Sequence, residues 1–340
     1  MLLAESAAVH DPRVLAPNSK QFYAPHMLRI RSKLRGGAIV RAVQVTRYGT
    51  PDVLRVADVE RPVPGPGEVL VRVAGTTFNA VDAAIRSGVM TELIPVELPY
   101  TPGLDLAGTV EGTGERVIAF LGVPVGGGAA EFAAVPRDRL VPAPRSVPLA
   151  DAAVLPVAGL TAFQGLFDHG GLRAGRRVLV NGAGGGVGGF AVQLAKRAGA
   201  HVIATASPRS RAAVEARGAD EVVDYTTTPL TEALTAPVDL LFNNVSGNPA
   251  ELSRLTDLVR DGGTAVSAPP LPLTDDEDRG VHWKVLYVRD DPAQLAGLVA
   301  AVDAGELVLD VSDRRPLADL ASVHADGEAG RLRGRVVVTL

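Results

Sequence analysis

The sequence predicts an α/β protein in which a doubly wound parallel sheet follows a β-rich N-terminal region. Two observations support this fold class. Residues 178–289 alternate apolar strands with amphipathic helical stretches, the pattern of a parallel sheet covered on both faces. Residues 40–156 instead contain short strands punctuated by prolines and glycines. With 340 residues and 46% hydrophobic content, the chain is long enough for two domains that each bury a core.

The elements follow from local patterns along the chain. In the β-rich region, strands are expected at 41–47 and 69–74, on either side of the turn Pro62–Gly67. Further on, strands are expected at 178–181, 201–206, 222–224, 238–243, 264–268 and 285–289, and helices at 190–198, 209–217 and 248–259. Asn248 and Pro249 would begin the last of these helices, and Gly262-Gly263 would end it. A helix at 292–304 and a strand at 334–340 are expected to return to the first region.

The segment from Val178 to Ala206 is the most informative, because it reads as strand, glycine-rich turn, helix and second strand. Such a βαβ unit binds a dinucleotide at the helix N-terminus. Gly182 would form the tight turn, Gly185 would let the backbone approach a pyrophosphate, and Gly188 would let the helix pack closely on the strand. The glycines also fit a second register, Gly184/Gly186/Gly189. The expected cofactor contacts in this loop are Gly182, Gly184, Gly185, Gly186, Val187 and Gly188.

The end of the second strand indicates which dinucleotide binds. An NAD site usually has an Asp or Glu about 20 residues beyond the glycines, to bind the ribose hydroxyls. This chain has Ser207, Arg209 and Arg211 there and no acid. Because a guanidinium suits a phosphate dianion, NADP(H) is expected rather than NAD(H). In the alternative interpretation Ser207 caps a helix that begins at Pro208 and the arginines are solvated, which does not exclude phosphate binding.

Composition narrows the function classes. The net charge of −4 gives no reason to expect nucleic acid or an anionic membrane as a partner, and no apolar run reaches the ~20 residues of a membrane span. The absence of cysteine excludes disulfides, thiol chemistry and Cys-ligated zinc. None of the six histidines lies in a His-Glu-x-x-His arrangement, so no metal site is expected.

Residues 1–39 differ from the rest of the chain. They hold six Lys and Arg against two acidic residues and lack the apolar core of a signal peptide, so disorder is expected there. An Arg-rich, acid-poor leader is also typical of a transit peptide. The bias of Arg over Lys instead suggests GC-rich bacterial coding, in which Val40 would be the true start.

An ordered series of motifs runs from Val40 to the end of the chain. They are Tyr48-Gly49-x-Pro51-Asp52-Val53-Leu54, Gly65-Pro66-Gly67-Glu68-Val69, Asn79-x-x-Asp82 with Ile85-Arg86-Ser87-Gly88, Pro102-Gly103-x-Asp105-x-Ala107-Gly108, Gly128-x-Ala130-Glu131-Phe132, Leu155-Pro156-x-Ala158-Gly159-Leu160-Thr161-Ala162, the glycine loop, and Leu332-Arg333-Gly334-Arg335-Val336-Val337. This series resembles the zinc-independent, zeta-crystallin-like quinone oxidoreductase branch of the medium-chain dehydrogenase/reductase superfamily. The resemblance implies a GroES-like catalytic domain at 40–156, completed by 290–340, and a Rossmann domain at 157–289. It also implies NADP(H) in the cleft between them, and a cytoplasmic homodimer.

The resemblance also suggests roles for single residues. Asn79 would orient the nicotinamide or the substrate, although such a residue alone is more typical of a turn. Thr161 would contact the cofactor or cap a helix, and Asp82 would be catalytic or would hydrogen-bond loop backbone. Tyr225 would contact the adenosine phosphate or be an ordinary strand aromatic. Further cofactor contacts are expected at Asn244 and Val245, after the fourth strand, and at Leu286 and Tyr287, in the last strand, where domains or subunits would meet.

Departures from the family pattern shape the expected chemistry. Gly103-Leu104-Asp105 stands where zinc-dependent relatives carry Gly-His-Glu, and Ala84 and Met90 stand where some quinone reductases carry tyrosines. Neither a zinc alcohol dehydrogenase mechanism nor a tyrosine proton donor at those positions is therefore expected. The leading interpretation is NADPH-dependent hydride transfer to a quinone or α,β-unsaturated carbonyl. The alternatives are an enoyl-thioester reductase acting on a carrier-bound chain and a non-catalytic NADPH-binding protein.

Overall fold

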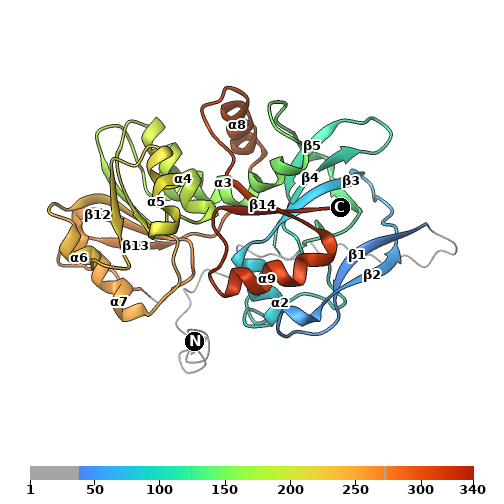
Figure 1. Ribbon diagram of the computed structural model, residues 1–340, viewed down its shortest axis with the longest axis horizontal. Coiled ribbons are helices and arrows are strands. Elements are labelled where there is room, and N and C mark those ends of the chain that lie inside the picture. The colour runs from blue at the N-terminus through green and yellow to red at the C-terminus, as the bar shows by residue number, and fades with distance from the viewer. Residues whose placement is uncertain (1–37, 124, 272) are drawn as a thin grey trace.

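The computed structural model describes residues 38–123, 125–271 and 273–340, so the expectation for residues 1–39 lies almost wholly outside the described residues. The chain forms two lobes, each built on its own large sheet, with helix α3 (Pro156–Phe163) between them (Figure 1). The two lobes share one buried apolar cluster. Leu104 and Ile118 of the first lobe, Ala158 of α3 and Val178 of the second all belong to it. A shared core fixes the face that one lobe presents to the other.

The first lobe is GroES-like and β-rich. Strands β1 (Ile39–Val45) and β2 (Leu54–Glu60) form an antiparallel ribbon. The main sheet has the order β14-β15-β3-β4-β5-β7, and β6 also pairs with β3. Its strands are β3 (Glu68–Thr77), β4 (Asp105–Val110), β5 (Arg116–Phe120), β6 (Phe132–Pro136), β7 (Val141–Pro142), β14 (Val311–Pro316) and β15 (Arg335–Thr339). Helices α2 (Ala80–Ser87) and α9 (Leu320–Glu328) pack together in this lobe. Two segments far apart in sequence therefore build one sheet.

The second lobe is a Rossmann fold. Its six parallel strands have the order β10-β9-β8-β11-β12-β13. The strands are β8 (Arg177–Asn181), β9 (His201–Ala206), β10 (Glu221–Asp224), β11 (Val238–Asn243), β12 (Val259–Ser267) and β13 (His282–Val285). Helices α4 (Gly186–Arg197), α5 (Pro208–Ala216), α6 (Leu230–Ala233) and α7 (Pro249–Ser253) connect them, and α8 (Pro292–Asp303) leads back to the first lobe. The strand order reverses between β8 and β11, and ligands of such sheets bind in the crevice outside the strand ends there.

Two predicted elements are wrong. The helix predicted at 248–259 ends at Ser253 and continues as a 3₁₀ turn to Leu258, and Gly262 and Gly263 lie within β12 rather than after a helix. The strand predicted at 285–289 is β13, which ends at Val285, and Leu286 is buried beyond the strand end. The apolar residues of both segments include buried ones, such as Leu255 and Leu286. A short apolar run indicates burial, but it does not distinguish a helix, a strand and buried irregular backbone.

Candidate cofactor-binding site

The glycine-rich loop follows β8 and leads directly into α4. Gly182 has a φ of +84°, a conformation that residues with a side chain rarely adopt. A Cβ at Gly188 would collide with the carbonyl oxygen of Gly182 and the backbone of Ala183, so α4 can approach the loop only with glycine there. The first N–H groups of α4 are therefore available at the crevice, where an anion would be stabilised.

Side chains tie together the strand ends beneath this loop. The Thr205 hydroxyl accepts a hydrogen bond from the N–H of Gly182 at 2.8 Å and donates one to Asn181 Oδ1 at 2.9 Å. The Asn181 amide in turn donates to Asn243 Oδ1 at 2.9 Å. Asn181 and Asn243 end β8 and β11, and Thr205 is the second-last residue of β9, so a polar network holds these strand ends together beneath the crevice. The roles of these three residues were not predicted, since each looks like an ordinary strand terminus in the sequence.

The segment that precedes β15 lies against the glycine loop. The N–H of Gly334 donates to the carbonyl of Gly184 at 3.2 Å, and Gly334 forms a parallel β-bridge with Gly185. The side chain of Arg335 packs on Gly186, where an added Cβ would collide with Arg335 Cδ. A residue of the GroES-like lobe thus completes the wall of the loop in the Rossmann lobe.

Arg335 is the centre of a buried polar network in the GroES-like lobe, at its boundary with the Rossmann lobe. Its side chain is 7% exposed, and its Nη2 lies 2.7 Å from Asp105 Oδ2, on a carboxylate with no exposed surface. Its Nη1 donates to Asn79 Oδ1 at 2.9 Å and to the carbonyl of Phe78 at 3.0 Å. Its Nε is buried without a hydrogen-bond partner and lies beside Gly186 at the start of α4. An unpaired buried donor is costly, so this one suits an anion bound at the helix N-terminus.

Asn79 is fully engaged within this network. Its amide nitrogen donates to Asp105 Oδ2 at 2.9 Å and to Asp82 Oδ2 at 3.2 Å, while its oxygen accepts from Arg335. Asp82 Oδ1 also accepts from the N–H of Gly103 at 3.2 Å, the structural hydrogen bond considered for it from the sequence. Burial, together with the charge of Asp105, raises the pKa of Asp82 to about 7. The structure therefore shows Asn79 as a connector between the carboxylates and Arg335.

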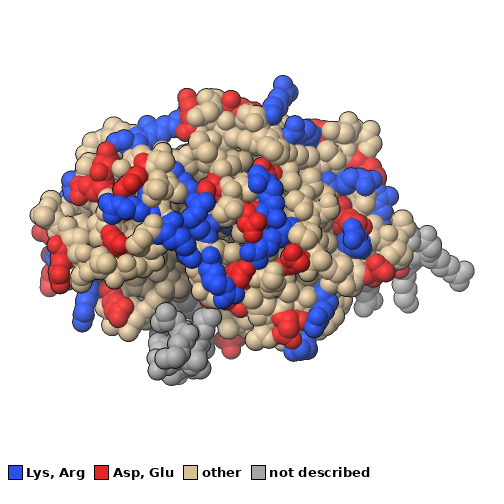
Figure 2. Space-filling model, in the orientation of Figure 1, with Lys and Arg blue, Asp and Glu red and all other residues tan. Residues whose placement is uncertain are grey.

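The two arginines after β9 have different partners. Arg209 donates to the carbonyls of Gly330 at 3.0 Å and Arg331 at 3.3 Å, so it reaches from α5 to the other lobe. Arg211 pairs with Glu215 along α5 at 2.8 Å. Ser207 occupies the N-cap position, but its side chain makes no cap hydrogen bond. Lys and Arg side chains gather over this boundary between the lobes (Figure 2). Both arginines are exposed in the first turn of α5, at the crevice end of the sheet.

Of the remaining predicted contacts, Asn244 and Val245 lie against the glycine loop. Val245 packs against Gly182, and the N–H of Asn244 donates to the carbonyl of Asn181 at 3.0 Å. Tyr225 lies directly after β10 rather than within it and is 57% exposed. Thr161 lies inside α3 and donates to the carbonyl of Val157 at 2.7 Å, so its alternative role as a helix cap is wrong.

Among the described histidines, His201 and His282 pair with acids and His324 is buried. His201 Nε2 lies 2.6 Å from Glu221 and His282 Nδ1 lies 3.0 Å from Asp275. Burial lowers the pKa of His324 to about 3. Across the part of the chain that the structure describes, no group of three or more His, Asp or Glu is arranged to hold a metal ion. In the same part, no helix combines the length and the apolar character needed to cross a membrane.

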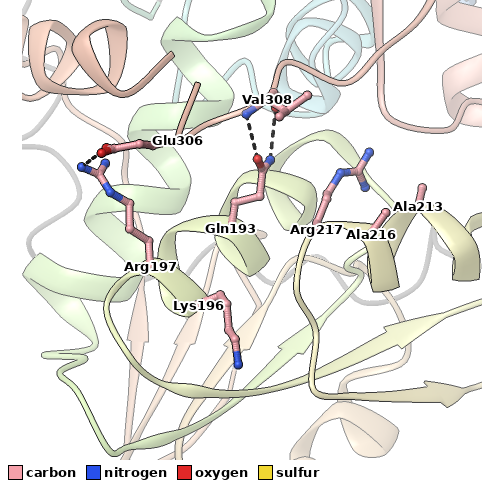
Figure 3. A pocket seen from close by; sticks show the side chains of 8 residues that line it. All are labelled: Gln193, Lys196, Arg197, Ala213, Ala216, Arg217, Glu306 and Val308. Carbon is pink, nitrogen blue, oxygen red and sulfur yellow. Dashed lines mark hydrogen bonds and ion pairs between the residues drawn. The ribbon is translucent and has the colours of Figure 1, made fainter. Parts of the chain in front are cut away.

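A cavity of about 520 Å³ lies away from the glycine loop, between the outer parts of α4 and α5 (Figure 3). Gln193 fixes one wall by bonding both backbone groups of Val308, at 2.8 and 3.1 Å. Arg197 pairs there with Glu306, and Lys196 pairs with Asp220. The cavity therefore lies apart from the crevice, and Lys196 and Arg197 on its wall are each paired with a carboxylate.

Comparisons with known proteins agree with this architecture. The family model for the alcohol dehydrogenase GroES-like domain matches residues 65–145, and that for zinc-binding dehydrogenase matches residues 217–338. A chloroplastic quinone oxidoreductase of Triphysaria versicolor is 32% identical over 329 residues, which cover 89% of this chain and 99% of the relative.

Solved structures show the same likeness. The quinone oxidoreductase of Coxiella burnetii matches with a TM-score of 0.82 and 26% identity, covering 89% of this chain and 100% of that one. A mycobacterial protein solved in complex with NADPH matches with a TM-score of 0.77 and 29% identity, covering 88% of this chain and 100% of that one. The chain belongs to the zeta-crystallin-like quinone oxidoreductase branch of the medium-chain dehydrogenase/reductase superfamily, and it is an oxidoreductase whose family uses a nicotinamide cofactor.

Proposed function

We propose that this protein transfers hydride from NADPH to a quinone or an α,β-unsaturated carbonyl. The observation that carries the proposal is the unpartnered Nε of Arg335, buried beside Gly186 at the N-terminus of α4. A cation with a free donor, at a helix end whose own N–H groups are unpaired, is suited to a pyrophosphate. The residues that would hold the pyrophosphate are the loop Gly182–Gly188 and Arg335. When bound, NADPH supplies the hydride, and the chain orients it and excludes water.

The preference for NADPH rests on the residues after β9. Arg209 and Arg211 occupy the start of α5, where an NAD site would carry an acid. Tyr225 is exposed at the end of the adjacent strand β10 and offers a ring and a hydroxyl to the same region. A 2′-phosphate there would gain charge-assisted hydrogen bonds. The mycobacterial neighbour solved with NADPH supports the same choice.

The class of acceptor follows from what the chain offers near the loop. The Asn79 amide is occupied by Asp82, Asp105 and Arg335, so it has no spare donor to polarise a carbonyl. A quinone or enone tolerates this, because conjugation spreads the incoming charge onto oxygen. An unactivated ketone would require a stronger stabiliser for its alkoxide. The similarity to quinone oxidoreductases points to the same acceptors.

Steady-state oxidation of NADPH and NADH against a quinone, an enal and a crotonyl thioester tests the proposal. Turnover is expected with the quinone or the enal and NADPH. Preference for the thioester would identify an enoyl-thioester reductase, and inertness toward all three despite tight NADPH binding would identify a non-catalytic binder. The double variant Arg209→Ala/Arg211→Ala should raise the KM for NADPH about tenfold or more and leave that for NADH almost unchanged. Arg254→Ala, at another exposed arginine, is the matched control.

We also propose a homodimer. β13 is the last strand of its sheet and pairs only with β12 among the described residues. An unpaired strand edge is a site for pairing with another chain. Sedimentation velocity at micromolar concentration should give twice the monomer mass, and a monomer would contradict this proposal.

A further inference from the structure

The segment from Leu286 to Asp290 crosses the crevice edge of the Rossmann sheet without being a helix or a strand. It begins where β13 ends, and the N–H of Leu286 donates to the carbonyl of Ser267, at the end of β12, at 2.8 Å. It therefore lies at the same sheet edge as the glycine loop after β8 and Asn244 after β11. Ligands of such a sheet bind along this edge. The backbone of the segment must be held by groups from outside it.

One buried side chain holds both backbone groups of Arg289. Gln164 has no exposed surface, and its Oε1 accepts from the N–H of Arg289 at 3.0 Å while its Nε2 donates to the carbonyl of Arg289 at 3.0 Å. The same nitrogen donates to Gln294 Oε1 at 2.9 Å. The side-chain amide of Gln164 thus bonds both the N–H and the carbonyl of Arg289, as the backbone of a neighbouring strand would. The contact with Gln294 on α8 fixes the orientation of the Gln164 amide.

The place of Gln164 in the fold is also informative. It is the first residue of a π-helical stretch, Gln164–His169, that directly continues α3. π-helical turns are rare and occur frequently at functional sites. The same stretch reaches the segment a second time, because Asp168 accepts from Arg289 Nη2 at 2.7 Å. The helix between the lobes therefore holds the crossing segment at two points.

The other lobe holds the next residue. Asp290 Oδ2 lies 3.4 Å from Arg139 Nε, and Arg139 also donates to the carbonyl of Leu121 at 2.7 Å. Arg289 is thus fixed from the Rossmann side and Asp290 from the GroES-like side. A segment held in this way keeps the backbone of Leu286 and Tyr287 in a defined conformation at the crevice edge, with the Leu286 side chain buried. Binding to a preorganised segment loses less conformational entropy.

We propose that Gln164 is a positioning residue for the nicotinamide half of the cofactor. It does not touch the cofactor and acts by holding the backbone of Arg289, and through it Leu286 and Tyr287, in the binding conformation. This inference rests on the proposed NADPH-dependent function. It adds a residue that acts on one half of the cofactor only, since the adenosine half is bound at the opposite end of the sheet by the residues after β9.

The test compares Gln164→Leu with the matched control Gln294→Leu. The first removes both hydrogen bonds to Arg289 and the one to Gln294. The second removes the contact with Gln164 and the hydrogen bond from Gln294 Nε2 to Asp168, and it leaves the Gln164–Arg289 pair in place. Binding of NADPH and of 2′,5′-ADP, which carries only the adenosine half, is measured by calorimetry, and kcat with a quinone is measured alongside. Gln164→Leu should weaken NADPH about tenfold or more and lower kcat, while 2′,5′-ADP binding stays within about twofold. Gln294→Leu should leave all three values within about twofold.

Other results overturn the inference. Equal effects of the two variants would show that the pair with Arg289 is not the cause. Equal weakening of NADPH and 2′,5′-ADP would show a general loss of structure. If Gln164→Leu does not fold, Gln164→Asn, which keeps the amide but shortens its reach, is measured against the same expectations. A wild-type protein that binds neither ligand would overturn the proposed function as well, whereas normal wild-type binding with an unaffected Gln164 variant would overturn this inference alone.

Discussion

Replacing Arg335 with methionine should leave Asp105 as an unpaired charge inside the protein. The Asp105 carboxylate has no exposed surface, and Arg335 is the cation that contacts it. After the replacement, Asp105 would keep the N–H of Val157 at 2.8 Å, the Asn79 amide at 2.9 Å and the Thr77 hydroxyl. These neutral donors solvate the carboxylate but do not neutralise it.

The expected cost can be worked out from these contacts. Removing one partner of a buried ion pair typically costs about 3–5 kcal/mol, because the remaining charge stays buried. Domains are stable by only about 5–15 kcal/mol, so the loss is a large share of the total. Methionine fills much of the volume of the arginine stem beside Gly186, which keeps the effect mainly electrostatic.

Urea unfolding of four proteins measures this effect. They are the wild type, Arg335→Met, Asp105→Asn and the double variant. The double variant should be more stable than the sum of the single losses predicts, by at least about 1 kcal/mol, because it no longer buries a lone charge. A loss below about 1 kcal/mol for Arg335→Met, or strictly additive losses, would refute the assignment of Arg335 as the counter-ion of Asp105.

Three further predictions concern the loop, the arginines and pH. Gly186→Ala should lower both the melting temperature and the affinity for NADPH, because its Cβ would displace Arg335. Gly185→Ala, whose Cβ meets nothing closer than 3.5 Å, should lower the affinity alone. Equal melting temperatures for the two variants would contradict this. Arg209→Ala should lower the free energy of unfolding by about 1 kcal/mol, because it loses the hydrogen bonds to carbonyls of the other lobe. Arg211→Ala should lower it by about 0.3–0.5 kcal/mol, because it loses a pair with Glu215 on the same helix. Equal losses in urea unfolding would argue against the contact of Arg209 between the lobes. The folded pKa of Asp82 is raised to about 7, so its contribution to stability is fully present below about pH 4 and is lost as pH rises from there through 7. Asp82→Asn should therefore flatten the decline in unfolding free energy between about pH 4 and 7, and an unchanged decline would exclude Asp82 as its source.

Local sequence patterns were sufficient to predict the Rossmann βαβ unit. The strands at His201–Ala206 and Val238–Asn243 were placed to the residue, and α4 was predicted from its glycines and its apolar face. Both signals act over a few residues. The helix predicted at 248–259 failed because Val259 begins a buried strand, and nothing in a short apolar run distinguishes the two.

Residues that act over long sequence separations were not predicted. In the sequence Arg335 stands out only as part of a terminal motif, because its partners Asn79 and Asp105 lie more than 200 residues away. Gln164 was not singled out because its partner Arg289 follows 125 residues later. The role of Asn79 near the nicotinamide stays a prediction, and the structure adds which groups occupy its amide. A single sequence carries no signal for such pairs, whereas a glycine-rich loop is recognisable wherever it occurs.

The two oxygens of Asp105 join three parts of the chain. Asp105 lies on β4, its Oδ1 accepts from Val157 at the start of α3, and its Oδ2 pairs with Arg335 on β15. Detaching the Rossmann lobe together with α3 would take the Val157 N–H away from Asp105 and Gly186 away from Arg335, and would expose the buried ion pair to water. The lobes should therefore not melt separately. A calorimeter should record one cooperative endotherm for the whole molecule.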